Sequence, residues 1–196
     1  GRGGFSEIGI STVLGYEDSQ ELSSARVSRL LDQVQFPSSL RDIQTGTLQV
    51  QSQATSNSDI LSAIRQCETA ENAQFFIGKD GKAVFRNRDY RISNTKAITV
   101  QASFSNDGSN LPYADIVTSF DIHEVRNVYQ WTRTGGTTQF VSDSNSVLRY
   151  RPVASVESTI NVSDSDVLSL IEQKIAETSL PIVRIDSLKV NPRQNT

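Results

Sequence analysis

Hydrophobic residues recur every three or four positions in three stretches of the chain, which predicts amphipathic helices over residues 22–35, 58–71 and 164–177. Asn57 or Ser58 is a suitable N-cap for the second helix and Ser163 for the third. The apolar stripes are Val27, Leu30, Leu31 and Val34; Ile60, Leu61, Ile64 and Cys67; and Val167, Leu168, Ile171 and Ile175.

Alternating apolar and polar positions predict strands over residues 48–51, 97–105, 115–122, 151–160 and 182–190. The last of these changes phase near Asp186 and Ser187. In a regular strand, Val183 and Ile185 would lie on one face and Leu188 on the other. One extra residue in the strand produces such a shift, so we expect a β-bulge there.

Residues 125–142 predict a β-hairpin that turns at Gly135 and Gly136. Two glycines between β-prone runs favour a two-residue turn, because such turns need positive φ angles. A two-residue turn places Trp131 opposite Phe140, and we expect both rings to lie on one face and to be largely buried.

A second hairpin is predicted over residues 74–87, with its turn at Asp80-Gly81. A two-residue loop there pairs Ile77 with Val84 and Phe76 with Phe85. Both faces of this hairpin are then apolar, so we expect both to be covered.

The order of these elements predicts an α+β fold in two domains. Residues 1–20 are an arm or loop, residues 21–92 form a small α+β domain, and residues 93–196 form a β-barrel or sandwich covered by the helix over 164–177. The boundary is expected at residues 92–96. The chain starts at Gly1 and contains no Met, so we expect it to be part of a longer polypeptide.

Composition excludes several functional classes. The net charge is −3 and neither half is basic, so the chain lacks the electrostatic pattern of a nucleic-acid-binding protein. No apolar run approaches about 18 residues, so stable membrane insertion is not expected. Cys67 is the only cysteine, which excludes an internal disulfide and favours a buried, inert thiol. His123 is the only histidine.

The sequence carries no motif for nucleophilic, metal-dependent or nucleotide-dependent catalysis. Glu68 and Glu71 lie three positions apart and could be a carboxylate pair, but a solvated helix face is the favoured interpretation. Residues 105–110 are rich in oxygen ligands, yet lack the acidic spacing of a calcium loop, which favours a plain turn. We therefore expect no enzyme activity, no catalytic residue, no metal and no cofactor.

Three further groups have a functional and a structural interpretation, and the structural one is favoured for each. Arg86, Arg88 and Arg91 could bind phosphate or form a surface ion-pair patch with Asp89. Tyr129, Trp131 and Phe140 could stack on a sugar or belong to the core. Asn161 begins a glycosylation sequon, which without a secretory signal is expected to arise by chance.

Four sequence blocks, in order over residues 22–192, resemble minor tail proteins of long-tailed bacteriophages, especially those of actinobacteria. The blocks are Ser24-Ala25-Arg26-Val27 to Thr45-Gly46, Phe76-Ile77 to Arg88, Arg126-Asn127-Val128 to Tyr150, and Pro181 to Pro192. The chain departs from this pattern at Tyr150-Arg151-Pro152, where such proteins often have Tyr-Gly followed by Arg. We expect this departure to affect the local turn but not the fold.

The resemblance implies a structural component of the tail tip in the virion, part of the baseplate hub that closes the tail tube. It implies a homotrimer around an axial channel, with two tube-like β-barrels per chain, of which this sequence contains one candidate. The implied partners are distal tail, tape measure and tip or fibre proteins, with DNA only in transit. The alternatives are a carbohydrate- or receptor-binding module of the tail, which would expose the hairpin aromatic rings in a cleft, and a tail-associated hydrolase.

Overall fold

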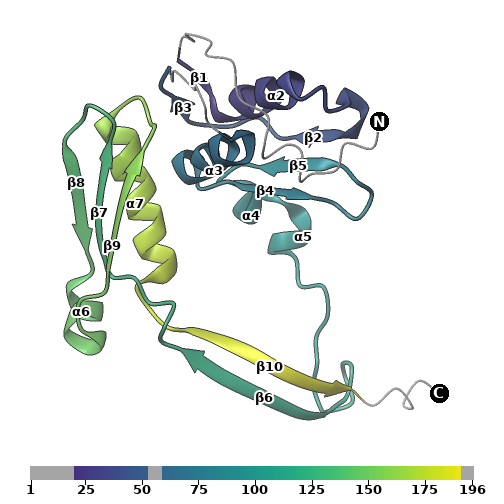
Figure 1. Cartoon of the computed structure of the whole chain (residues 1–196). Helices are drawn as coiled ribbons and strands as arrows, with labels where there is room; N and C mark the ends of the chain where they lie inside the picture. The colour runs from purple at the N-terminus through teal and green to yellow at the C-terminus, as the bar shows by residue number, and fades with distance from the viewer. Residues whose placement is uncertain (1–19, 53–58, 191–196) are drawn as a thin grey trace.

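The computed structural model describes residues 20–52 and 59–190. Its helices and strands form an α+β fold, as predicted, and its strands form four small sheets (Figure 1). We divide these residues into three parts: an α+β unit (residues 21–98), a sheet–helix layer (residues 128–178) and a two-stranded ribbon (residues 113–121 and 182–190).

Two helices of the α+β unit pack against each other and against one face of the sheet β2-β5-β4 (Figure 1). Their apolar stripes point inward, as the spacing predicts, except at Leu61, which is exposed. Leu30, Ile64 and Phe85 are among the buried residues of this core. The elements are β1 (Glu21–Leu22), α2 (Ser23–Gln33), η1 (Ser38–Leu40), β2 (Arg41–Ile43), β3 (Gln49–Val50), α3 (Ile60–Glu71), β4 (Gln74–Ile77), β5 (Ala83–Arg86), α4 (Tyr90–Ser93) and α5 (Thr95–Ile98).

The ends of α3 are set by two polar residues. The Asp59 carboxylate accepts hydrogen bonds from the amides of Leu61 and Ser62, and Asn72 ends the helix with φ 54°. Asp59 is therefore the N-cap; the predicted caps, Asn57 and Ser58, lie outside the described residues.

The β4–β5 hairpin forms where it was predicted, but its register is shifted by one residue. Ile77 pairs with Ala83 and Phe76 with Val84. The loop contains three residues instead of two, because a turn from Gly78 is followed by Gly81 at φ 78°. Ile77 and Phe76 are exposed, so the expectation that both faces are covered is wrong for β4.

The strand predicted over residues 97–105 is not present. Its first two residues end α5, and of the rest only Phe104 forms an isolated bridge, with Leu111. An alternating sequence without a neighbouring strand cannot satisfy its backbone groups in a sheet. The short helices α4 and α5 occupy the predicted boundary at 92–96, and the division into two domains stays a prediction.

The sheet–helix layer places α7 across one face of the sheet β8-β7-β9 (Figure 1). β9 runs parallel to β7, and β8 runs antiparallel to it. Helix α6 follows β8 and was not predicted. The elements are β7 (Val128–Arg133), β8 (Thr138–Ser142), α6 (Ser144–Tyr150), β9 (Ala154–Thr159) and α7 (Asp164–Thr178), whose N-cap is Ser163 as predicted.

The β7–β8 turn is also one residue longer than predicted. The Gly136 amide donates to the Arg133 carbonyl oxygen at 3.0 Å, and Gly135 has φ 70° at the second central position, which requires glycine. Trp131 therefore pairs with Gln139, and Gln130 pairs with Phe140. The predicted Trp131–Phe140 pair is wrong, because the longer loop moves the two rings to opposite faces.

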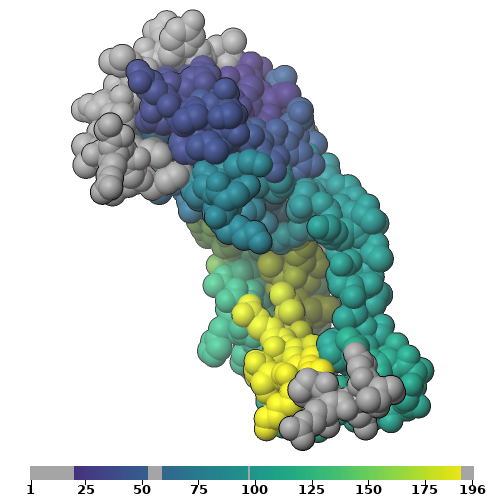
Figure 2. All heavy atoms as spheres, turned by 90° about the vertical axis from the view of Figure 1, so that its right-hand side faces the viewer, coloured from purple at the N-terminus to yellow at the C-terminus, as the bar shows by residue number. Residues whose placement is uncertain are grey.

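The ribbon consists of β6 (Tyr113–Asp121) and β10 (Ile182–Val190), which pair only with each other. It extends from the sheet–helix layer toward the end of the molecule remote from the α+β unit (Figures 1 and 2). No closed barrel exists among the described residues: β6 and β10 do not join β7–β9, so the two sheets keep free edges. The predicted barrel or sandwich is corrected to an open layer and a ribbon.

The α+β unit contacts the sheet–helix layer through hydrogen bonds and through Ile160, which packs against the core of the α+β unit. The Gln51 amide donates to the Ile160 carbonyl oxygen at 2.7 Å, and Nδ2 of the buried Asn161 donates to the Ala70 carbonyl oxygen at 2.8 Å. Nζ of Lys174 donates to Oδ1 of Asn72 at 2.7 Å. These bonds join the C-terminal end of α3 and the residue after β3 to the segment after β9 and to α7.

Candidate assembly surface

The ribbon contains the predicted bulge. Ile185 pairs with Thr118, whereas Ser187 pairs with the next residue of β6, Val117, so Asp186 is the extra residue. Because directly paired residues share a face, the bulge returns Leu188 to the face that carries Ile185.

One face of the ribbon is apolar along most of its length. Phe120 is paired with Val183, and their side chains lie on the same face as Ile185. The exposed fraction is 71% for Phe120 and 61% for Ile185, which is unusual for large apolar residues that lie in a row. We call the following residues the apolar face: Ile116, Thr118, Phe120, Val183, Ile185 and Leu188.

The opposite face of the ribbon carries the charged residues, which are paired, beside the exposed Val117 and Ile182. Arg184 lies 3.7 Å from Asp121, and Lys189 lies 3.7 Å from Asp115. The Ser119 hydroxyl donates to Asp186 at 2.9 Å, which holds the side chain of the bulge residue on this side. The ribbon is therefore amphipathic, with a neutral apolar face and an ion-paired polar face.

The hairpin residues singled out by the sequence lie on both faces of the β8-β7-β9 sheet. Trp131 is 2% exposed against α7; its Nε1 donates to the Ser155 hydroxyl at 3.0 Å, and its ring centroid lies 5.9 Å from that of Tyr129. Phe140 is 56% exposed on the outer face, so its predicted burial is wrong. Two of the three rings considered as a sugar platform are therefore core.

Several residues of the sequence blocks are internal structural groups. Nδ2 of the buried Asn127 donates to the Ser146 hydroxyl at 3.1 Å and to the Arg151 carbonyl oxygen at 2.8 Å, and its Oδ1 accepts from the Val153 amide at 2.7 Å. The Ser146 hydroxyl in turn donates to the Ser179 carbonyl oxygen. This network fixes the path of the chain around α6.

A comparable network surrounds Glu71, which is fully buried. Its carboxylate accepts from the Thr47 amide at 2.7 Å, the Leu48 amide at 2.8 Å and the Ser23 hydroxyl at 2.9 Å. A Cβ atom at Gly46 would lie 2.1 Å from the Ser23 hydroxyl oxygen, so a larger residue there requires Ser23 to move. The expected solvated face is wrong for Glu71, because this carboxylate binds the loop before β3.

Arg86 and Arg88 are engaged within the chain. The Arg86 guanidinium donates to the Asp42 carboxylate at 2.8 Å, and this hydrogen bond lowers the pKa of Asp42. Arg88 donates to the Ser169 hydroxyl at 3.4 Å. An ion pair thus forms at this cluster, with Asp42 as the partner of Arg86.

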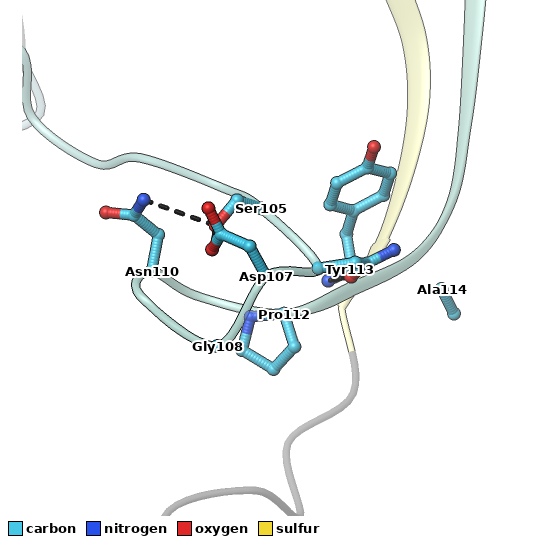
Figure 3. A pocket seen from close by; sticks show the side chains of 8 residues that line it. Ser105, Asp107, Gly108, Asn110, Pro112, Tyr113 and Ala114 are labelled. Atoms are coloured by element: carbon cyan, nitrogen blue, oxygen red, sulfur yellow. Dashed lines mark hydrogen bonds between the residues drawn. The ribbon is translucent and has the colours of Figure 1, made fainter.

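Ser105–Asn110 form a turn that lines an open hollow of about 640 Å³ (Figure 3). The Asp107 carboxylate accepts from the Ser109 amide at 2.9 Å, and hydrogen bonds from the Ser105 and Ser109 hydroxyls lower its pKa to about 2. The described residues contain no group of three or more acidic, histidine or cysteine side chains arranged to bind a metal.

The other chemical candidates are buried. Burial raises the pKa of the Cys67 thiol to about 12, which makes it unreactive, as predicted. Asn161 is fully buried, so the sequon is not accessible in the folded chain. No helix within residues 20–52 and 59–190 is long and apolar enough to cross a membrane.

These features define an α+β protein that has an uncovered apolar face on a projecting ribbon and buried polar networks that are structural. Solved structures with a similar fold include two tail proteins. A prophage tail protein, gp18 from Listeria monocytogenes EGD-e, matches with a TM-score of 0.50 and 8% identity over 91% of this chain and 55% of its own length.

A tail protein from Neisseria meningitidis MC58 also matches with a TM-score of 0.50 and 8% identity, over 87% of this chain and 50% of its own. The chain thus shares a fold with both and spans about half of their length. No protein-family model and no curated protein matches its sequence.

The apolar face was not predicted as a site from the sequence. The sequence does contain the pattern of this face. Ile116 and Phe120 lie an even number of positions apart, which places them on one face of a strand, and the same holds for Val183 and Ile185. Their exposure could not be read from the sequence, since it depends on β6 and β10 pairing apart from the other strands.

Proposed function

We propose that the chain is a structural component of a bacteriophage tail, located at the tail tip. There it forms part of the hub that closes the tail tube and connects it to tip or receptor-binding proteins. The observation that carries the proposal is the fold shared with two tail proteins over 91% and 87% of the chain. The four sequence blocks support it independently.

In this proposal the chain assembles as a homotrimer around an axial channel through which DNA passes. Its open sheets support an assembly role, because free strand edges are a liability that contacts between copies remove. The strands within residues 97–190 lie near the lumen, and residues 22–91 lie further out. The net charge of −3 suits a wall past which DNA moves without binding. Distal tail, tape measure and tip or fibre proteins are the proposed neighbours.

The proposed role requires no catalysis. The polar groups at the centre of each network, Glu71 and Asn127, have structural hydrogen-bond partners in the described chain. If the purified chain cleaved peptidoglycan or another glycan, and one polar substitution abolished that cleavage, the hydrolase alternative would replace this proposal.

Imaging of the assembled particle tests the location and the symmetry. We expect three copies of the chain around the tail axis at the tip, and a trimeric mass for the purified chain in analytical ultracentrifugation. A single copy, or density on a side fibre away from the axis, would contradict the hub assignment and support the receptor-binding alternative.

A further inference from the structure

The apolar face of the ribbon lacks a cover within the described chain. A two-stranded ribbon is marginally stable alone and usually needs a third strand or a packed helix on its apolar side. Here β6 and β10 pair only with each other, and Phe120, Val183 and Ile185 are all exposed. The exposed side chains are neutral, so burying them costs no charge desolvation.

The size of this face limits what can cover it. Nine residues per strand at about 3.3 Å each, on two strands about 4.8 Å apart, give a surface of roughly 300 Å². A stable contact between two independent proteins buries about 800 Å² on each partner. The apolar face is therefore too small to hold a separate protein by itself. It suits a contact between copies that other surfaces of the same assembly already hold together.

Another uncovered sheet face in the described chain provides a matching surface. On the outer side of β8-β7-β9, Phe140 and Val156 flank Gln130 in one cross-strand row. Val156 is 68% exposed, and Phe140 is exposed as noted above. A ring of copies requires two different patches that meet head to tail, and these two sheet faces can form such a pair.

We infer that the apolar face of the ribbon packs against the outer face of the β8-β7-β9 sheet in a second copy of this chain. The packing is sheet on sheet, with Phe120 of one copy against the row of Phe140 and Val156 in the next. The polar face of the ribbon, with its pairs of Arg184 with Asp121 and Lys189 with Asp115, stays in water. This inference rests on the proposed function, because it requires copies arranged around an axis.

A matched pair of substitutions tests the contact. Phe120→Asp places a charge on the apolar face, and Val117→Asp places the same charge on the polar face of the same strand. We expect Phe120→Asp to raise the concentration at which the full chain assembles by about tenfold or more, and Val117→Asp to leave it nearly unchanged, in analytical ultracentrifugation. Tryptophan fluorescence from the buried Trp131 reports whether each variant remains folded.

Disulfide trapping identifies the two faces directly. The only native cysteine is buried and unreactive, so introduced cysteines report on the contact alone. A mixture of Phe120→Cys and Phe140→Cys chains should form a cross-linked dimer on oxidation, whereas Val117→Cys with Phe140→Cys should not.

The outcomes separate the inference from the proposed function. A trimer that is unaffected by Phe120→Asp and gives no Phe120–Phe140 cross-link would overturn the contact and leave the hub proposal in place. A wild-type chain that stays monomeric in solution and in the particle would overturn both.

Discussion

Arg151 has a backbone conformation that a residue with a Cβ atom rarely adopts, with φ 68° and ψ 164°. This region is essentially restricted to glycine and costs about 1–3 kcal/mol for other residues. Two neighbours hold the residue there: Pro152 requires an extended ψ before it, and the Arg151 carbonyl oxygen accepts from Asn127. Arg151 is also the position at which the minor tail proteins that the four sequence blocks resemble often have glycine.

We therefore predict that Arg151→Gly stabilises the chain by about 1 kcal/mol, because relieved strain exceeds the added freedom of glycine in the unfolded state. Urea denaturation measures the change. Arg149→Gly, two residues earlier in α6, is the control and should destabilise by about 1 kcal/mol. Equal losses in the two variants would show that Arg151 is not strained.

Trp131 and Phe140 lie on opposite faces of one hairpin, and their substitution should have different effects on stability. Trp131→Ala should destabilise by about 3–5 kcal/mol, since a buried ring and its hydrogen bond are lost. Phe140→Ala on the exposed face should change stability in the monomer by less than about 0.5 kcal/mol. Thermal or urea unfolding measures both changes. A similar large loss for Phe140→Ala would contradict the observed register and favour the predicted Trp131–Phe140 pair.

At the scale of elements, helix α3 is bound to the loop before β3 through one carboxylate. Each Glu71 oxygen accepts from a backbone amide, Oε1 from Thr47 and Oε2 from Leu48. Glu71→Gln must therefore point an NH₂ group at one of these amides, whichever way the side chain is turned.

We predict that Glu71→Gln lowers the free energy of unfolding by about 1–3 kcal/mol, the cost of an unsatisfied buried donor. Glu172→Gln on the exposed side of α7 is the control and should stay within about 0.5 kcal/mol of the wild type. Equilibrium denaturation distinguishes the two. A neutral effect at Glu71 would mean that the network does not contribute to stability.

The elements also show what could be predicted from the sequence. The three long helices were predicted to within about two residues, because their apolar stripes and the Ser163 cap act locally. The bulge at Asp186 was predicted from alternation alone. Both hairpin registers were wrong by one residue, because Gly81 and Gly135 adopt positive φ in loops one residue longer than the two-residue turn. The barrel was not predictable from periodicity, since strand partners depend on contacts between distant residues.

At the scale of the whole molecule, the α+β unit and the sheet–helix layer meet through few hydrogen bonds. Nδ2 of Asn161 donates to the Ala70 carbonyl oxygen at 2.8 Å, close to the bond from the Gln51 amide to Ile160. Val50 and Asn161 also form an isolated bridge. Because such interfaces are more polar than a core, a single contact contributes a large share of their stability.

We predict that Asn161→Asp loosens this interface, since a carboxylate replaces the donor and faces a carbonyl oxygen. Hydrogen exchange at the Gln51 amide should accelerate by about tenfold or more, while exchange at Phe85 in the core of the α+β unit stays nearly unchanged. Exchange mass spectrometry or NMR measures both sites. Uniform acceleration across the chain would indicate global destabilisation instead of a local interface effect.

The single extra residue at Asp186 also limits how β10 can change in length. Deleting Asp186 would leave Ile185 and Ser187 adjacent and still paired with Thr118 and Val117, so Leu188 would stay on the face that carries Ile185. Deleting a second residue between Ile185 and Leu188 would move Leu188 to the side that carries Arg184 and Asp121, although no side chain of the apolar face had been altered. One residue can therefore be lost at the bulge without exchanging the two surfaces of the ribbon, and homologous strands that lack the bulge should be one residue shorter between these two positions.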